Sequence, residues 1–241
     1  MADSAQFKAQ NKLLMLAIDH RDSIKKKFTS EQEIINFKTE IIASLQDQFS
    51  GVLIDVKYGL PAYKNRNKPF LLPAEKSGYQ EVDGERITQL EYSANELKKL
   101  GAGGVKLLLN FKPDGKTANQ QLELAKEVGQ DSAKENLPFF LEIVTYGNKQ
   151  NSVVRSVEIF LQNSIRPDVF KLEFPGDEAS CKKITEKLRC IPGIANFSFA
   201  ISSSLEIEKM KKSIDKLIVK KKTFKVEASR SNKSFKHTSP E

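Results

Sequence analysis

Three apolar segments each carry one ionisable side chain among aliphatic and aromatic neighbours: Lys106, Glu142 and Lys171. The segments are residues 104–110, 138–146 and 168–174. In a strand, successive side chains point to opposite faces, so each charged group would project from an otherwise buried sheet. Because unpaired charges inside a protein are costly, three of them indicate an active site.

A lysine in an apolar pocket can act as a nucleophile. Desolvation and a second cation both disfavour the ammonium form, which lowers the pKa of such a lysine from about 10.4 towards neutrality. The neutral amine attacks a ketone and forms a Schiff base, which accepts electrons while the adjacent C–C bond breaks. In this chemistry Lys171 is the nucleophile, Lys106 the neighbouring cation and Glu142 the proton carrier.

The alternative is a structural layer of ion pairs inside a barrel, joining Lys106 or Lys171 to Glu142 or Glu173. Strand alternation alone favours neither interpretation. Buried ion pairs contribute little to stability after desolvation, which favours the catalytic one.

More polar residues follow two of the predicted strands. Asp19, His20 and Arg21 come directly after the first, and Asp55 lies near the end of the second. Asp19 can hydrogen-bond substrate hydroxyls, and Arg21 can bind a carboxylate, a phosphate or Asp19. Alternatively, this segment is the start of a helix near Asp22. Asp55 has the same two interpretations, and a lone histidine such as His20 is more often structural.

Short apolar segments alternate with longer amphipathic ones along the chain. The predicted strands are residues 13–19, 52–56, 69–74, 105–110, 138–146 and 168–174. The predicted helices include residues 31–49, 87–100, 118–135 and 152–163. Strand alternating with helix predicts an α/β fold with parallel strands, either a doubly wound sheet or a (β/α)₈ barrel. Polar residues at the C-terminal ends of the strands favour the TIM-type barrel.

The pattern weakens after six βα units. A seventh strand is expected near residues 194–201, and only residues 217–219 offer an eighth. No glycine follows Gly193, although tight turns and phosphate loops usually need glycine. We therefore predict that the last two strands are degraded or missing. The expected division is a barrel domain at 1–208 and a poorly ordered basic tail, rich in Lys and Ser, at 209–241.

Charge and length narrow the class of protein. The chain has 241 residues, of which 39% are hydrophobic, enough for one large domain. Its formal net charge of +8 comes from residues 209–241, where 11 Lys and Arg stand against 3 Asp and Glu. The body is neutral, so a nucleic acid is not an expected partner.

The cysteines and the N-terminal region suggest a cellular location. Cys181 and Cys190 match no metal or redox spacing. The apolar run 13–18 is too short to span a membrane, and the start of the chain does not resemble a signal peptide. We therefore expect a cytoplasmic protein without a membrane, metal or cofactor requirement.

The chain resembles the tagatose 1,6-diphosphate aldolase family of metal-independent class I aldolases, including relatives that act on sulfofructose phosphate or deoxy-ketogluconate phosphate. The matching runs are residues 16–21, 53–62, 74–79, 101–109, 138–143 and 168–173. They stand in order and cover roughly residues 10–192.

The resemblance implies a (β/α)₈ barrel that cleaves a phosphorylated ketose, one like tagatose 1,6-bisphosphate, reversibly to dihydroxyacetone phosphate and an aldehyde, without a cofactor. It implies Lys171 as the Schiff-base lysine, Glu142 as the proton-transfer group, and Lys106 and Asp19 as substrate-binding groups. His20 stands where some members carry glutamine. Family habit further implies a homo-oligomer.

The chain departs from the family pattern after Pro192. Family members continue with a strand that ends in Ser/Thr-x-Gly and a last strand with a Gly-x-x-x-Gly-Arg-like phosphate loop, and neither motif occurs here. We hypothesise a frameshift or mis-splicing, with impaired substrate binding. The rival interpretation is a non-catalytic remnant whose basic tail binds an acidic partner. A metal-dependent aldolase is disfavoured because His20 and His237 are the only histidines.

Overall fold

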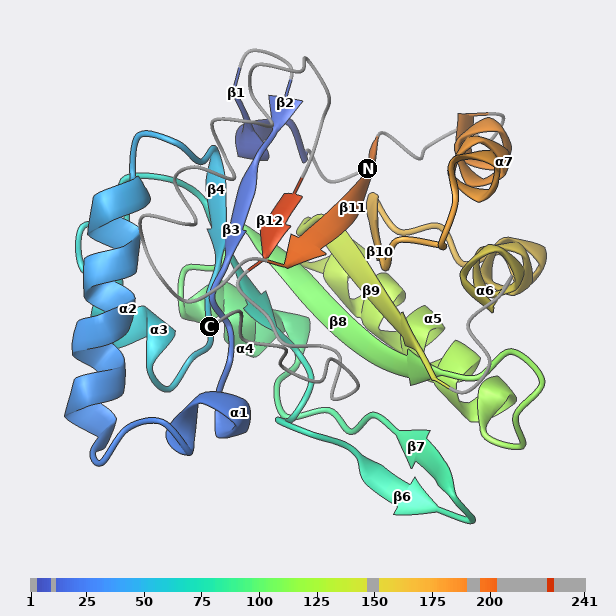
Figure 1. The fold of residues 1–241 in the computed structure, drawn as a ribbon, viewed down its shortest axis with the longest axis horizontal. Helices are drawn as coiled ribbons and strands as arrows, with labels where there is room; N and C mark the ends of the chain where they lie inside the picture. The colour runs from blue at the N-terminus through green and yellow to red at the C-terminus, as the bar shows by residue number, and fades with distance from the viewer. Residues whose placement is uncertain (1–3, 10–11, 147–151, 190–195, 203–224, 228–241) are drawn as a thin grey trace, which may run out of the picture.

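The computed structural model describes residues 4–9, 12–146, 152–189, 196–202 and 225–227. Eight parallel strands form a closed barrel in the order β10-β11-β12-β3-β4-β5-β8-β9 (Figure 1). They are β3 (Met15–Ala17), β4 (Gly51–Leu53), β5 (Phe70–Pro73), β8 (Gly104–Phe111), β9 (Phe139–Thr145), β10 (Val169–Leu172), β11 (Asn196–Ser202) and β12 (Lys225–Glu227). The α/β barrel expected from the sequence is confirmed.

The C-terminal strands correct one expectation. The seventh strand, β11, lies where the sequence placed it, and its backbone pairs with β10 and β12. The eighth strand, β12, is only three residues long, yet it pairs with β3 and closes the barrel. The last two strands are therefore present, although the eighth is short. Strand β12 falls in the stretch 209–241 that was expected to be a tail, and residues 217–219 lie outside the described residues.

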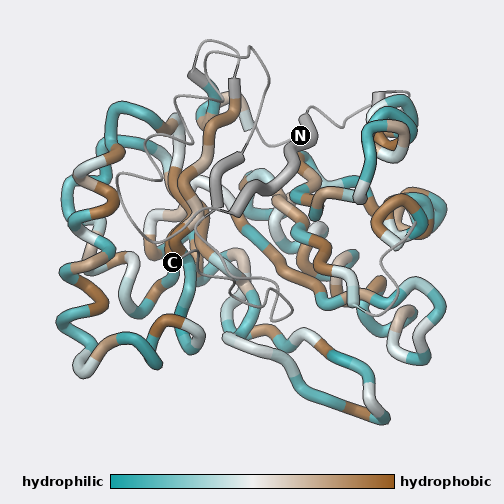
Figure 2. The backbone as a smooth tube through the Cα atoms, in the orientation of Figure 1, coloured by the Kyte–Doolittle hydropathy of each residue, from teal (hydrophilic) through white to brown (hydrophobic). Residues whose placement is uncertain are grey.

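Helices pack around the barrel (Figure 1). They are α1 (Asp22–Lys25), α2 (Glu31–Leu45), α3 (Gly59–Ala62), α4 (Ala94–Lys99), α5 (Ala118–Lys134), α6 (Ser152–Gln162) and α7 (Glu178–Arg189). In α2 the buried residues Ile34, Ile41, Ile42 and Leu45 recur at helical spacing and form one apolar stripe. Figure 2 shows the resulting pattern, with apolar strands inside and polar helix faces outside.

The helix predicted at residues 87–100 begins later than expected. Strands β6 (Gln80–Val82) and β7 (Glu85–Ile87) form an antiparallel hairpin with positive φ at both turn residues, Asp83 (52°) and Gly84 (74°). An Asp-Gly turn of this kind suits the twist of a hairpin. Helix α4 starts only after Ser93, which forms a capping box with Glu96.

Gly101 ends α4. Gly101 adopts a φ of +90° just beyond the last helical turn. Its N–H donates to the Lys98 carbonyl (2.9 Å), and the Ala102 N–H donates to the Leu97 carbonyl (3.1 Å). This pair of bonds is a Schellman motif, which favours glycine because of the left-handed conformation.

One end of the barrel interior is filled with apolar side chains. They are Phe7, Leu13, Met15, Ala17, Leu53, Leu71, Phe140 and Val169. Phe7 comes from the short 3₁₀ helix η1 (Ser4–Phe7), which precedes the small pair β1 (Lys8–Ala9) and β2 (Lys12–Leu13). Its ring is fully buried and lies edge-on to Phe140, with the ring centroids 5.3 Å apart.

The next inward position is charged along β3, β9 and β10. Two residues beyond Ala17, Phe140 and Val169 stand Asp19, Glu142 and Lys171, respectively. A step of two residues keeps the side chain on the same face of a strand. The apolar layer is therefore followed by an ionisable layer towards the C-terminal ends of the strands.

Candidate active site

A cavity of about 320 Å³ opens at the C-terminal ends of the strands. Its lining includes Asp19, His20, Arg21, Glu75, Lys106 and Glu142. Five of these six residues were predicted from the sequence.

No helix in the described part of the chain is long and apolar enough to cross a membrane.

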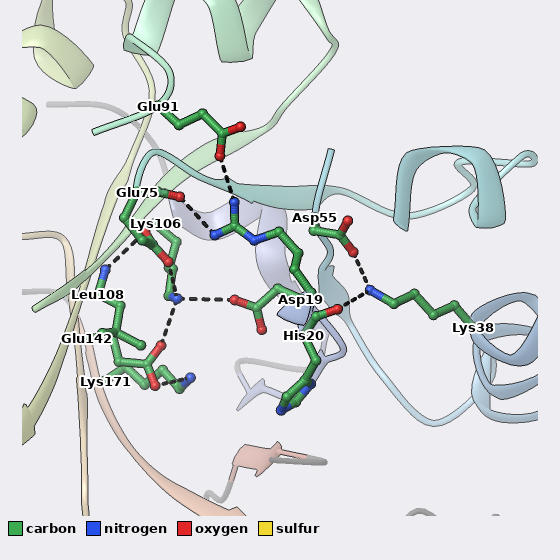
Figure 3. Close-up of polar contacts among 11 residues, drawn as sticks. Asp19, His20, Lys38, Asp55, Glu75, Glu91, Lys106, Leu108, Glu142 and Lys171 are labelled. Atoms are coloured by element: carbon green, nitrogen blue, oxygen red, sulfur yellow. Dashed lines mark hydrogen bonds and ion pairs between the residues drawn. The ribbon is translucent and has the colours of Figure 1, made fainter. Parts of the chain in front are cut away.

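Lys106 is the centre of the charged layer. Its Nζ lies 3.1 Å from Asp19 Oδ2, 2.6 Å from Glu75 Oε1 and 3.1 Å from Glu142 Oε2 (Figure 3). Burial alone would lower the pKa of Lys106, but the charges of Asp19, Glu142 and Glu75 outweigh it and hold this pKa well above its ordinary value. Lys106 is therefore a permanent cation.

Glu142 joins the two lysines of the site. One oxygen faces Lys106 at 3.1 Å, and the other forms an ion pair with Lys171. Glu142 and Lys171 are direct neighbours across strands β9 and β10. The Lys171 side chain is only 4% exposed and is absent from the cavity lining, whereas Glu142 lines it. Figure 3 shows the Lys171 ammonium beside the Glu142 carboxylate.

Glu75 belongs to the site and was not predicted as a site residue. Its Oε1 accepts from Lys106, and its Oε2 accepts from the Leu108 N–H at 3.1 Å. Burial raises the pKa of the Glu75 carboxyl, and the charge of Lys106 opposes that rise. The signal in the sequence was its position directly after the apolar strand at 69–74, the same kind of position that identified Asp19.

Arg21 lines the cavity and braces its wall. The guanidinium donates to Glu91 Oε2 (2.9 Å) and to the Glu75 carbonyl oxygen (2.8 Å). Of the partners proposed for Arg21, the structure shows a carboxylate, and it is that of Glu91. The backbone after Arg21 also forms α1, so the alternative of a helix start at Asp22 is confirmed.

Asp55 lies away from the cavity in a fully buried ion pair with Lys38 of α2. Its other oxygen accepts from the Tyr58 N–H at 2.6 Å. Lys38 Nζ also donates to the His20 carbonyl at 2.8 Å, which ties α2 to the backbone of the Asp19–Arg21 segment. The structure thus gives Asp55 a supporting position, and it does not support direct contact with a substrate.

The charged side chains of the site determine which chemistry it can support. In the described residues, no group of three or more His, Cys, Asp or Glu side chains is placed to hold a metal ion. What the site does contain is a chain of alternating charges, in which Lys171, Glu142, Lys106 and Asp19 are successive neighbours. Such a chain can transfer a proton at Glu142 and keep a positive charge fixed at Lys106.

The chain is similar in sequence to known aldolases. Tagatose 1,6-diphosphate aldolase 1 of Streptococcus mutans serotype c is 32% identical over 186 residues, which cover 66% of this chain and 57% of that protein. Tagatose 1,6-diphosphate aldolase of Staphylococcus aureus (strain Newman) is 31% identical over 186 residues, with the same coverage of 66% and 57%. The chain thus spans 57% of the length of these relatives.

Solved structures show the same fold. An archaeal fructose-1,6-bisphosphate aldolase, whose catalytic Lys is covalently bound to the carbinolamine intermediate, superposes with a TM-score of 0.63 at 18% identity, covering 90% of this chain and 86% of that one. Triosephosphate isomerase from Bartonella henselae gives a TM-score of 0.53 at 14% identity, with 89% and 91% covered.

The family assignment rests on a longer match. The sequence profile described as DeoC/LacD family aldolase matches residues 13–217, which extends beyond Pro192, where the resemblance was expected to stop. Because this match covers most of the chain, the protein belongs to the DeoC/LacD aldolase family.

Proposed function

We propose that this protein is a class I aldolase that cleaves a phosphorylated ketose reversibly to dihydroxyacetone phosphate and an aldehyde, through a Schiff base on Lys171. The observation that carries the proposal is the contact of the buried Lys171 ammonium with Glu142, a carboxylate that reaches the cavity. The S. mutans and S. aureus relatives, named as tagatose 1,6-diphosphate aldolases, support this substrate class.

The first step releases the nucleophile. Glu142 accepts a proton from the Lys171 ammonium, and the ion pair between them is lost. The neutral amine can then turn towards the cavity and attack the ketone carbon, forming a carbinolamine. Glu142 returns the proton to the carbinolamine hydroxyl, which leaves as water and gives the protonated Schiff base.

The second step breaks the C–C bond. Glu142, again a carboxylate, takes the proton of the hydroxyl on the far carbon of that bond, the oxygen's electrons form the aldehyde carbonyl, and the bonding pair moves into the Schiff base to give an enamine. Glu142 then returns this proton to the enamine carbon, and water releases the ketone product from Lys171. Asp19, which faces the cavity, is positioned to orient substrate hydroxyls.

The structure changes the role expected of Lys106. The sequence suggested that its charge lowers the pKa of the nucleophile, but three carboxylates surround Lys106 and balance that charge. We assign Lys106 to another task, which is to hold Glu142 in reach of Lys171. Binding of substrate oxygens by Lys106 stays the role that the resemblance implies.

Borohydride trapping tests the proposal. Reduction of the purified chain in the presence of dihydroxyacetone phosphate should attach the sugar irreversibly to Lys171, as located by peptide mass spectrometry. Lys171→Met should remove the label, whereas Lys99→Met, at an exposed position on α4, should keep it. A folded chain that takes no label would overturn the proposal and favour a non-catalytic remnant.

A further inference from the structure

Asn110 lines the cavity with a side-chain amide that the chemistry proposed above does not use. It lies near the end of β8, four residues beyond Lys106 and two beyond Leu108. All three residues line the cavity, and steps of two keep their side chains on one face of the strand. The intervening residues Leu107 and Leu109 are fully buried in the main apolar core. The Asn110 side chain therefore points into the cavity.

The Asn110 amide has no hydrogen-bonding partner in the part of the chain that the structure describes. The hydrogen bonds shown for this residue all belong to its backbone. Only 7% of the residue is exposed, and buried side-chain amides are nearly always hydrogen-bonded because an unmet donor or acceptor is costly. A buried, unpartnered amide that faces a cavity indicates a ligand that bonds to it.

The backbone of Asn110 is fixed on the side where β5 has ended at Pro73. Its N–H donates to Thr88 Oγ1 (3.4 Å), and its carbonyl accepts from Gln121 Nε2 (2.8 Å). Gln121 is only 1% exposed, and its Oε1 accepts from the Thr88 N–H (3.3 Å). These bonds join β8 to α5 and to the segment after β7. The amide is thus presented from a rigid element, as a specific binding group requires.

Strand register sets the level of Asn110 in the barrel. Lys171 is the neighbour of Glu142 across β10 and β9, and Glu142 is the neighbour of Leu108 across β9 and β8. Asn110 is the neighbour of Val144, two residues further along both strands. Two residues of a strand span about 6.6 Å. Asn110 therefore lies one inward position beyond the level at which the Schiff base would form.

The proposed chemistry indicates which substrate hydroxyl reaches that level. Lys171 bonds to the ketone carbon, C2, and Glu142 takes the proton of the C4 hydroxyl. The C3 hydroxyl lies between these two carbons and stays at the level of Glu142. The C5 hydroxyl is the first one beyond the reacting carbons, and it lies towards the mouth because apolar side chains such as Phe140 fill the other end. An amide suits it, since both groups donate and accept hydrogen bonds.

We propose that Asn110 hydrogen-bonds the C5 hydroxyl of the ketose and thereby selects aldehydes that carry a hydroxyl next to the aldehyde carbon. The inference rests on the proposed function, because Lys171 and Glu142 fix the positions of C2 and C4. Leu108 and Val144, which line the cavity beside Asn110, have apolar side chains and offer the hydroxyl no bond. One polar group on an otherwise apolar stretch of wall fixes the orientation of a ligand.

Condensation, the reverse of cleavage, tests the contact with two aldehydes that differ by one hydroxyl. Glyceraldehyde 3-phosphate carries the hydroxyl that becomes the C5 hydroxyl, and 3-oxopropyl phosphate lacks it. With dihydroxyacetone phosphate as the donor, Asn110→Leu should lower kcat/KM for glyceraldehyde 3-phosphate about 10- to 100-fold and change that for 3-oxopropyl phosphate less than about 2-fold. Asn119→Leu, at an exposed position on α5, is the matched control and should change neither.

The comparison of aldehydes separates a contact from a structural role. A distorted cavity would slow both aldehydes by the same factor, and such an equal loss would overturn the assignment of Asn110. Asn110→Ala removes the amide without filling the cavity and should give the same selective loss as Asn110→Leu. If Asn110→Leu fails to fold, as judged by its thermal transition, Asn110→Ala carries the test.

The two proposals fail in different ways. Borohydride trapping with dihydroxyacetone phosphate, which has no C5, should label Lys171 in Asn110→Leu as it does in the wild-type chain. A labelled wild-type chain whose preference for glyceraldehyde 3-phosphate survives both substitutions would overturn the contact at Asn110 alone. Absence of a label in the wild-type chain would overturn the aldolase proposal, and the assignment of Asn110 with it.

Discussion

Lys38 and Asp55 form an ion pair in which neither side chain is exposed to solvent. The pair joins the middle of α2 to the end of β4, and Lys38 also binds the His20 carbonyl at 2.8 Å. Burial lowers the pKa of Lys38, and the charge of Asp55 opposes that effect. The pair therefore holds the segment that carries Asp19 against the barrel.

Lys38→Met should destabilise the fold strongly. The substitution leaves the Asp55 carboxylate buried without its cation, and removal of one partner of a buried pair costs about 3–5 kcal/mol. Urea unfolding followed by circular dichroism measures this loss. Lys27→Met, at an exposed position after α1, serves as the control. Equal unfolding midpoints for the two variants would show that the pair contributes nothing.

Glu142→Gln should slow formation of the Schiff base. The substitution removes the carboxylate that contacts Lys171 and takes its proton in the proposed reaction, and loss of a general base reduces rates by about 100- to 10,000-fold. Single-turnover labelling with dihydroxyacetone phosphate and borohydride gives the rate. Glu123→Gln, on the exposed side of α5, should label at the wild-type rate. A Glu142→Gln chain that labels equally fast would exclude Glu142 as the proton carrier.

Lys106→Met should destabilise the fold, and adding Glu75→Gln should recover part of the loss. Removal of Lys106 leaves Asp19, Glu75 and Glu142 without the cation that they share, at a cost of about 3–5 kcal/mol. Replacing one of the three carboxylates reduces their repulsion. We expect a coupling energy of about 0.5–3 kcal/mol in a double-mutant cycle. Strictly additive effects would contradict this account.

The same pair predicts a pH dependence. In Lys106→Met, the folded state binds the Glu75 proton more tightly than the unfolded state, because burial raises its pKa above 4.5 and Lys106 no longer opposes the rise. Stability of this variant should therefore fall as pH rises above 4.5, and Glu75→Gln should reduce that slope. Urea unfolding at a series of pH values distinguishes the two variants.

Glu85 should stabilise the fold at neutral pH and lose this effect in acid, which is the reverse of the trend expected for Lys106→Met. Its carboxylate accepts from the Thr117 N–H (2.9 Å) at the start of α5, and this bond lowers the pKa of Glu85 to about 2 from 4.5. The contribution is complete above pH 4.5 and is lost as pH falls towards about 2. The stability difference between wild type and Glu85→Gln should shrink over that interval. A difference independent of pH would rule out the ionised cap.

Most of the candidate site could be predicted because it depends on local rules. Side-chain alternation identified Lys106, Glu142 and Lys171, and the structure places them in one chain of contacts. Lys38 was missed although it lies four residues after Ile34 and three before Ile41, in phase with the apolar stripe of α2. Its partner, however, depends on how α2 packs on the barrel, which no local pattern encodes.

The fold was harder to predict where elements are short. Asp83-Gly84 is a hairpin signal, and Ser93 with Glu96 is a capping box, so the late start of α4 was readable from the sequence. Strand β12 was not, because Lys-Val-Glu carries no apolar alternation over three residues. Its position follows from closing the barrel between β11 and β3, which is a tertiary constraint.

Phe7 fills the end of the barrel opposite the ionisable layer, together with Met15, Leu53 and Phe140. In the proposed aldolase reaction, a sugar would therefore enter, and both cleavage fragments would depart, through the mouth of the cavity beside the β6–β7 hairpin. The fragment that is not covalently attached must diffuse out first, and the enamine remains until that route is clear. We expect ordered release, in which the aldehyde leaves before the ketone. The two products should therefore give different patterns of product inhibition.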